Sequence, residues 1–134
     1  MWGIPVFNDW INDGVRLAEE FRQGDPFPLL VIDDFLDVQT ADGLLAEFPK
    51  PDAMPKSRDY VFGDKHELSS VAEQGPTSRA LYDALMGEQF RSFICALTGK
   101  DLFVDPAFHG GGFHPSANGG FPGTHLAFNM HPLH

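Results

Sequence analysis

Apolar and polar positions follow a helical period at the start of the chain and a different pattern soon after it. In residues 7–24 the apolar side chains form a rough stripe, and Gly24 follows the last of them, which predicts a first helix. The compact apolar run of residues 27–36 predicts a strand instead. Asp33 and Asp34 lie near the end of this run, where a role in a turn or a helix cap is expected.

The next stretch predicts a second helix and then mostly irregular structure. Residues 37–51 fit a helix with Thr40 as a possible N-cap and Pro49 at its end. Residues 50–76 are polar and interrupted by proline and glycine. This composition favours irregular backbone, with a short strand around residues 60–63.

Two helical patterns then follow in succession. Residues 76–87 begin with proline and offer Thr77 or Ser78 as a cap, which is typical of a helix start. Residues 88–99 predict a further helix that ends at Gly99.

The character of the sequence changes at about residue 100. Glycine, proline, phenylalanine and histidine dominate residues 100–134, which fits short strands and tight loops better than helices. A chain of 134 residues is about the size of one ordinary domain. We therefore expect a single α+β domain, with a mainly helical layer and one or two strands in residues 1–99 and a sheet that begins in residues 100–134.

Charge and cysteine content exclude several functional classes. The 19 acidic residues outnumber the 9 basic ones and no basic run exists, so binding to nucleic acid or to an anionic membrane is not expected. No apolar stretch is long enough to cross a membrane, and residues 1–14 lack the pattern of a signal peptide. Cys95 lies at an apolar helical position, which favours a small buried side chain over a nucleophile. As the single cysteine it cannot form an internal disulfide, which favours the cytoplasm.

Histidines gather near the end of the chain. Five of the six lie between His109 and His134. Because histidine at neutral pH is both a metal ligand and a proton carrier, this region is the candidate functional site. The alternative is that the histidines pack against the aromatic residues of glycine-rich loops. The three glycines at 110–112 favour a tight turn over a phosphate-binding loop, because no Lys-Ser or Lys-Thr pair follows them.

Three runs of sequence occur in an order that resembles a known enzyme family. They are FPLLVIDDFL, ADGLLAEFP and, most specific, GGGFHPSANGGFPGTHLAFNMHP. Together they resemble the N-terminal part of the prolyl-4-hydroxylase-like branch of the iron(II)/2-oxoglutarate-dependent dioxygenase superfamily. The resemblance implies a double-stranded β-helix (jelly roll) flanked by helices. It also implies an iron held by two histidines and a carboxylate, with 2-oxoglutarate chelating two further positions.

The last run matches the family pattern His-x-Asp-Phe-Asn-x-His-Pro, and the match implies roles for four residues. His125 corresponds to the proximal iron ligand. Residues i and i+2 of a strand share a face, so the next residue to point at the metal is Ala127, where the family has a carboxylate. Asn129 and His131 match the pattern, and the resemblance implies that they support the site without binding the metal.

Ala127 has three interpretations. The 2-oxoglutarate-dependent halogenases carry alanine or glycine at this position, which leaves room for a halide on the iron, so the chain would use Fe(II), 2-oxoglutarate and chloride. Alternatively, the chain is a catalytically inactive jelly-roll module for binding or assembly, or the alanine was introduced into a hydroxylase. We favour the halogenase because His125, Asn129 and His131 otherwise match.

The match does not include the distal histidine or the basic residue that holds 2-oxoglutarate in the family. The sequence therefore predicts only the first strands of the jelly roll. A second polypeptide segment, a longer parent chain or, less favoured, a swapped homodimer would complete the barrel. Phe113 and His114 correspond to the substrate mouth of the family and are candidate contacts for a small-molecule or carrier-bound substrate.

Overall fold

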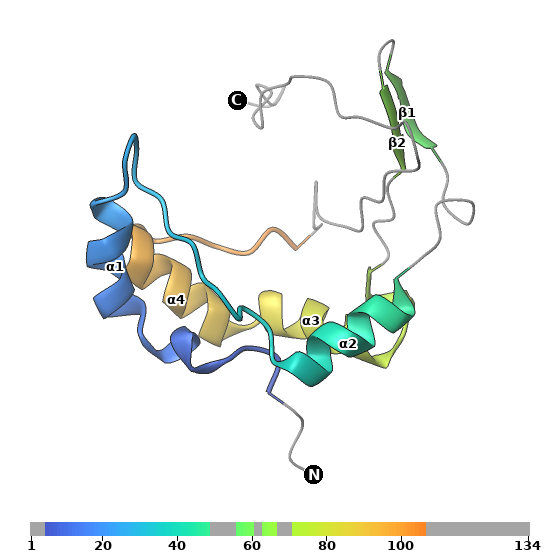
Figure 1. The fold of residues 1–134 in the computed structure, drawn as a ribbon, viewed down its shortest axis with the longest axis horizontal. Coiled ribbons are helices and arrows are strands. Elements are labelled where there is room, and N and C mark those ends of the chain that lie inside the picture. Colours follow the sequence, from blue (N-terminus) through green and yellow to red (C-terminus); the bar gives the residue numbers. More distant parts are fainter. Residues whose placement is uncertain (1–4, 49–55, 61–62, 67–70, 107–134) are drawn as a thin grey trace. The chain divides into compact units, whose positions relative to one another are not determined.

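The chain divides into two compact units. The computed structural model describes residues 5–48, 56–60, 63–66 and 71–106. The first unit comprises Met1–Phe48 with Ser69–Gly111, and the second comprises Pro49–Leu68 with Gly112–His134. The four α-helices described all belong to the first unit (Figure 1).

The N-terminal helical pattern forms two consecutive helices. A 3-10 helix, η1 (Asp9–Asn12), leads into α1 (Gly14–Arg22), which confirms the predicted helix apart from the break between them. Helix α1 packs against α4 (Glu88–Thr98), and the two lie side by side in Figure 1. The contact is close at Gly14, where a Cβ atom would lie 3.2 Å from the Cβ of Ala96 and 3.3 Å from the ring of Phe93.

The core of the first unit lies between these helices and the N-terminal segment. Its buried members come from the segment before η1 and from η1, α1 and α4: Phe7, Ile11, Leu17, Phe93 and Leu97. Their burial follows the helical spacing seen in the sequence, since residues three or four positions apart share a helix face.

Aromatic side chains extend this core toward the segment that precedes helix α2 (Val38–Glu47). The rings of Trp10 and Phe35 stack with centroids 4.6 Å apart, and the Phe7 ring lies 5.5 Å from Phe35. The indole Nε1–H of Trp10 also donates a hydrogen bond of 2.8 Å to the carbonyl oxygen of Phe35. A ring stack and a hydrogen bond therefore fix the end of this segment against η1.

Residues 27–36 do not form the predicted strand. A single bridge joins Phe7 to Leu36, and no sheet partner is described for the rest of the segment. The apolar side chains pack on the helices instead of facing another strand: Leu30, Ile32, Phe35 and Leu36. The predicted turn role of the two aspartates is confirmed, and Asp34 adopts a positive φ of 51°, which aspartate tolerates better than most residues.

Helix α2 (Val38–Glu47) begins at a different cap from the one predicted. The carboxylate of Asp37 accepts hydrogen bonds from the backbone N–H groups of Gln39 (3.0 Å) and Thr40 (3.4 Å). Thr40 is instead buried in the first turn, so its assignment as the N-cap is wrong. Both residue types cap helices well, and the aspartate comes first along the chain.

The two helices predicted in succession are both present. A short 3-10 helix, η3 (Val71–Glu73), precedes α3 (Pro76–Leu85), which starts at the predicted proline. Helix α4 ends at Gly99, whose φ of 68° gives the left-handed C-terminal cap that glycine favours. The cap residue of α3 is Gly75, so neither Thr77 nor Ser78 caps this helix as predicted.

The second unit contains a hairpin among its described residues. Strands β1 (Lys56–Tyr60) and β2 (Gly63–His66) pair antiparallel, with Tyr60 opposite Gly63. The short strand expected around residues 60–63 overlaps only the last residue of β1 and the first residue of β2, and residues 61–62 lie outside the described residues.

The predicted α+β fold leading into a jelly roll is wrong for the part of the chain that the structure describes. Helices dominate there, and no jelly-roll sheet is seen. The physical reason lies in residues 27–36. The apolar side chains of this segment are partly buried against helices, so a sheet is not required to remove them from solvent. The sheet was predicted to begin in residues 100–134. Residues 100–106 form no strand, and residues 107–134 lie outside the described residues.

Candidate functional site

The residues of the predicted iron site lie outside the described part of the chain. This applies to the candidate substrate contacts, to the proximal ligand and to its neighbours: Phe113, His114, His125, Ala127, Asn129 and His131. Within the described residues, no group of three or more His, Cys, Asp or Glu side chains is arranged to hold a metal ion. The roles proposed for His125 and the other residues of the predicted iron site therefore stay predictions from sequence.

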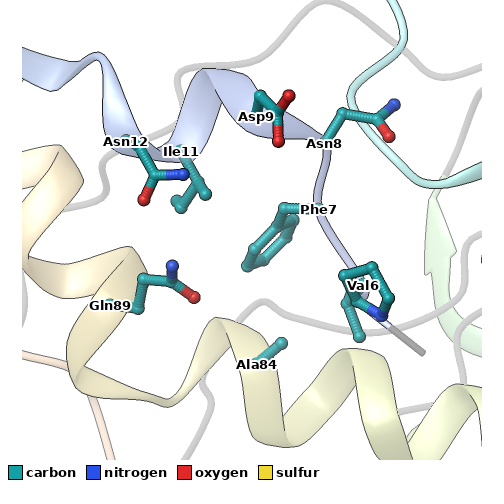
Figure 2. Close-up of a pocket in the computed structure, with 9 residues that line it drawn as sticks. Val6, Phe7, Asn8, Asp9, Ile11, Asn12, Ala84 and Gln89 are labelled. Carbon is teal, nitrogen blue, oxygen red and sulfur yellow. The ribbon is translucent and has the colours of Figure 1, made fainter. Parts of the chain in front are cut away.

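A pocket of about 230 Å³ lies beside Phe7, between η1 and the adjoining parts of α3 and α4. Figure 2 shows the Phe7 ring near its centre, with Ala84 of α3 and Gln89 of α4 opposite η1. The polar side chains around it are amides and one carboxylate: Asn8, Asp9, Asn12 and Gln89. The pocket is thus a small hollow with an apolar centre and polar surroundings.

The amide of Asn8 is already engaged in holding the fold. Its Nδ2 donates hydrogen bonds to the carbonyl oxygens of Asp34 (2.5 Å) and Leu36 (3.0 Å). Asp9, Asn12 and Gln89 are exposed to solvent. The pocket offers hydrogen bonds to a small polar molecule or to water, but it contains no nucleophile paired with a base.

A more open groove of about 400 Å³ borders the N-terminus of α1 and α4. It shares Ile11, Asn12 and Gln89 with the first pocket, and Val15 on its rim is 84% exposed. Its other polar lining residue is Ser92. No residue in this groove ionises near neutral pH, so its walls provide packing and hydrogen bonding but no acid–base chemistry.

The most strongly perturbed carboxylate described is Glu47, at the C-terminal end of α2. It reaches across to the start of α3, where its Oε1 accepts from the N–H of Thr77 (2.8 Å). Its Oε2 accepts from the N–H (2.7 Å) and the hydroxyl (2.6 Å) of Ser78, which is completely buried. Glu47 therefore caps α3 in place of a side chain from that helix's own first residues.

The ionised form of Glu47 is strongly preferred. Partial burial acts against the charge, but the hydrogen bonds from Ser78 and Thr77 outweigh it and lower the pKa of Glu47 to about 2. The partial positive charge of a helix N-terminus also favours an anion at this point. A carboxyl group with so low a pKa is a poor proton donor or acceptor at neutral pH, so Glu47 has a structural role.

Glycines allow α2 and α3 to approach closely enough for this cap. A Cβ atom at Gly75 would lie 2.5 Å from the Cδ of Glu47, in the space that the carboxylate occupies. A Cβ atom at Gly43 would lie 2.6 Å from the Oγ1 of Thr77. Sequence reasoning missed this cap because Glu47 and Ser78 are 31 positions apart. One feature of the sequence pointed to such a cap. Helix α3 starts at a proline, and the residue before it, Gly75, has no side chain with which to cap the helix.

Cys95 is half-buried and contacts the chain beyond α4. Its Sγ accepts a hydrogen bond from the N–H of Leu102 at 3.4 Å. On the same helix, Arg91 pairs with Asp101 (2.8 Å) and lies 4.9 Å from the ring centroid of Phe103. These contacts fasten residues 101–103 to α4, so the cysteine has a packing role but is less buried than the sequence predicted.

No helix among the described residues is long and apolar enough to cross a membrane. Comparison with models of known protein families, with curated proteins and with solved structures found no match.

Proposed function

We propose that this chain is a portion of an Fe(II)/2-oxoglutarate-dependent oxygenase-type enzyme, and that the enzyme is a halogenase rather than a hydroxylase. The observation that carries the proposal is His125 followed two residues later by Ala127, with Asn129 and His131 in the matching positions after them. All four lie in the run that resembles the dioxygenase family most specifically.

The chemistry follows from the number of ligands. If residues 125–127 are extended, His125 and Ala127 face the same side, and the imidazole binds iron while the methyl group leaves the carboxylate's position free. Bound iron and 2-oxoglutarate would activate dioxygen, which is the oxidant, and chloride would take the free position. Asn129 and His131 would orient the ligand through hydrogen bonds.

The donor set of the motif is incomplete on its own. One imidazole does not hold iron in a facial site, which needs a second histidine, and no basic residue has been assigned to the 2-oxoglutarate carboxylate. We therefore propose that a second polypeptide segment supplies the distal histidine and the 2-oxoglutarate anchor. Phe113 and His114 would contact a small-molecule or carrier-bound substrate. The strong negative charge argues against nucleic acid as a partner.

The test compares Ala127→Asp with Leu126→Asp, which adds the same charge at the neighbouring position on the opposite strand face. Each form is first combined with the second polypeptide segment proposed above. It is then titrated anaerobically with Fe(II) and 2-oxoglutarate, with and without chloride, and the visible charge-transfer absorption of the iron chelate is recorded. We expect chloride to alter the spectrum of the unmodified chain and of Leu126→Asp but not that of Ala127→Asp. If chloride has no effect and Ala127→Asp only strengthens iron binding, the halogenase assignment is wrong.

The same titration separates the alternatives. Absence of any iron–2-oxoglutarate chelate would favour a catalytically inactive binding or assembly module, for which the alanine at position 127 is the supporting observation. In a separate assay with dioxygen present, chloride-independent hydroxylation restored by Ala127→Asp would favour a hydroxylase into which the alanine was introduced. We also propose a cytoplasmic location, supported by the single cysteine at position 95.

A further inference from the structure

The segment Leu29–Ile32 has the side-chain pattern of a strand, but none of the strands that the structure describes pairs with it. Leu30 and Ile32 pack against the helical core, while Val31 between them is 72% exposed. This alternation is the one expected of an extended chain with one face buried. In Figure 1 the segment runs past α4 toward α2 without a helical turn.

Beyond Leu29, the backbone of this segment is unpaired within the part of the chain that the structure describes. Leu30, Val31 and Ile32 make no backbone hydrogen bond with any described residue, whereas each would make such bonds within a sheet. An extended row of free N–H and C=O groups is the feature of an edge strand that recruits another strand.

The segment is held in place at both of its ends. At its start, the N–H of Leu29 donates to the carbonyl oxygen of Phe21 at 3.1 Å. Beyond its end, the N–H of Asp37 donates to the carbonyl oxygen of Val6 at 3.0 Å, and Asn8 binds the carbonyl of Leu36. Because these contacts fix the conformation in advance, a strand that paired here would lose less entropy than one binding a loose loop.

The charge around the segment selects among possible partners. Residues 25–37 contain four aspartates and no lysine or arginine, and Asp33 and Asp34 are both exposed directly after the segment. A second copy of this chain would bring the same aspartates and a formal charge of −10. Charge complementarity therefore favours a basic partner over self-association.

We propose that Leu29–Ile32 is a docking edge for an extended segment of a partner polypeptide, which adds to it as a strand through main-chain hydrogen bonds. The partner segment carries apolar residues at alternate positions, one of which covers Val31, and lysine or arginine at the end that meets Asp33 and Asp34. This mode of recognition takes affinity from the backbone and specificity from alternate side chains. The proposal does not depend on the iron site.

The test measures amide hydrogen exchange at Leu30, Val31 and Ile32 by NMR in the full chain. The probe is a short synthetic peptide of alternating valine and threonine with lysines at one end. Two control peptides carry glutamate in place of lysine, or N-methyl groups on alternate amides that remove the main-chain donors. We expect the lysine peptide to slow exchange at these amides about tenfold or more, and both controls to have little effect.

Two variants locate the effect. Val31→Lys should weaken binding of the lysine peptide at least about tenfold, since it removes the apolar contact and adds a like charge. Val15→Lys makes the same change at a valine that is 84% exposed on α1, and it should bind like the unmodified chain. Unchanged exchange at the three amides, or equal slowing by the N-methylated peptide, would overturn the proposal. Slowing that depends on protein concentration without any peptide would also overturn it, because the occupant would then be a second copy.

Discussion

Replacing Glu47 with glutamine should destabilise the contact between α2 and α3 with little change in side-chain size. The carboxylate accepts three hydrogen bonds at the start of α3, from Thr77 and from the buried Ser78. A glutamine offers one acceptor oxygen and turns its NH₂ group toward donors. At least one N–H or O–H at this point would therefore lose its partner.

The size of the effect follows from the pKa of Glu47. A value of about 2, against an ordinary 4.5, corresponds to roughly 3 kcal/mol of preference for the ionised form. Because the side chain is only partly buried, solvent screening reduces this to about 1–2 kcal/mol, which is the range measured for loss of a helix cap. The folded-state pKa is lowered, so the contribution is complete above about pH 4.5 and is lost as the pH falls toward about 2.

Urea unfolding followed by circular dichroism measures this contribution at pH 7 and at several values below pH 4.5. We expect Glu47→Gln to lower the unfolding free energy by about 1–2 kcal/mol at pH 7, with a difference that shrinks as the pH falls. Glu20→Gln is the matched control, because Glu20 is exposed on α1 and its side chain makes no hydrogen bond or ion pair with any described residue. Equal stability of Glu47→Gln and the unmodified chain at pH 7 would refute the reasoning.

Two further changes test the packing of the helical unit. Gly43→Ala should destabilise the chain by about 1–3 kcal/mol in urea unfolding, because its Cβ would lie 2.6 Å from the Oγ1 of Thr77; an unchanged midpoint would show that the helices can separate freely. Trp10→Phe should cost about 1 kcal/mol by removing the donor to the carbonyl of Phe35, and the near-ultraviolet circular dichroism should lose the signal of the stacked indole. Retention of both stability and that signal would count against the contact.

Local signals in the sequence predicted most of the helices. Pro76 at the start of α3 and Gly99 at the end of α4 act through their own backbone preferences, so they specify a boundary without help from distant residues. The N-cap of α2 was misplaced because Asp37 and Thr40 are both good caps, and the choice depends on where the first turn starts.

The other features depend on contacts between residues far apart in the sequence, so local patterns did not predict them. An apolar run such as residues 27–36 fits a strand or any buried extended segment, and only the helices that cover Leu30 and Ile32 decide between them. The cap from Glu47 to Ser78 depends on how α2 and α3 pack, which no local pattern encodes. The iron-site residues rest on the match of a sequence run alone, since they lie outside the described residues.

The most direct test of the proposed function asks which histidine binds the metal first. The chain, combined with the second polypeptide segment proposed above, is titrated with Co(II) as a paramagnetic substitute for Fe(II), and the ring-proton NMR signals of this chain's six histidines are followed. We predict that the signals of His125 broaden first, and that His125→Ala abolishes this high-affinity step while His134→Ala retains it. Simultaneous broadening of all six histidines, or a first step that survives His125→Ala, would contradict the assignment of His125 as the iron ligand.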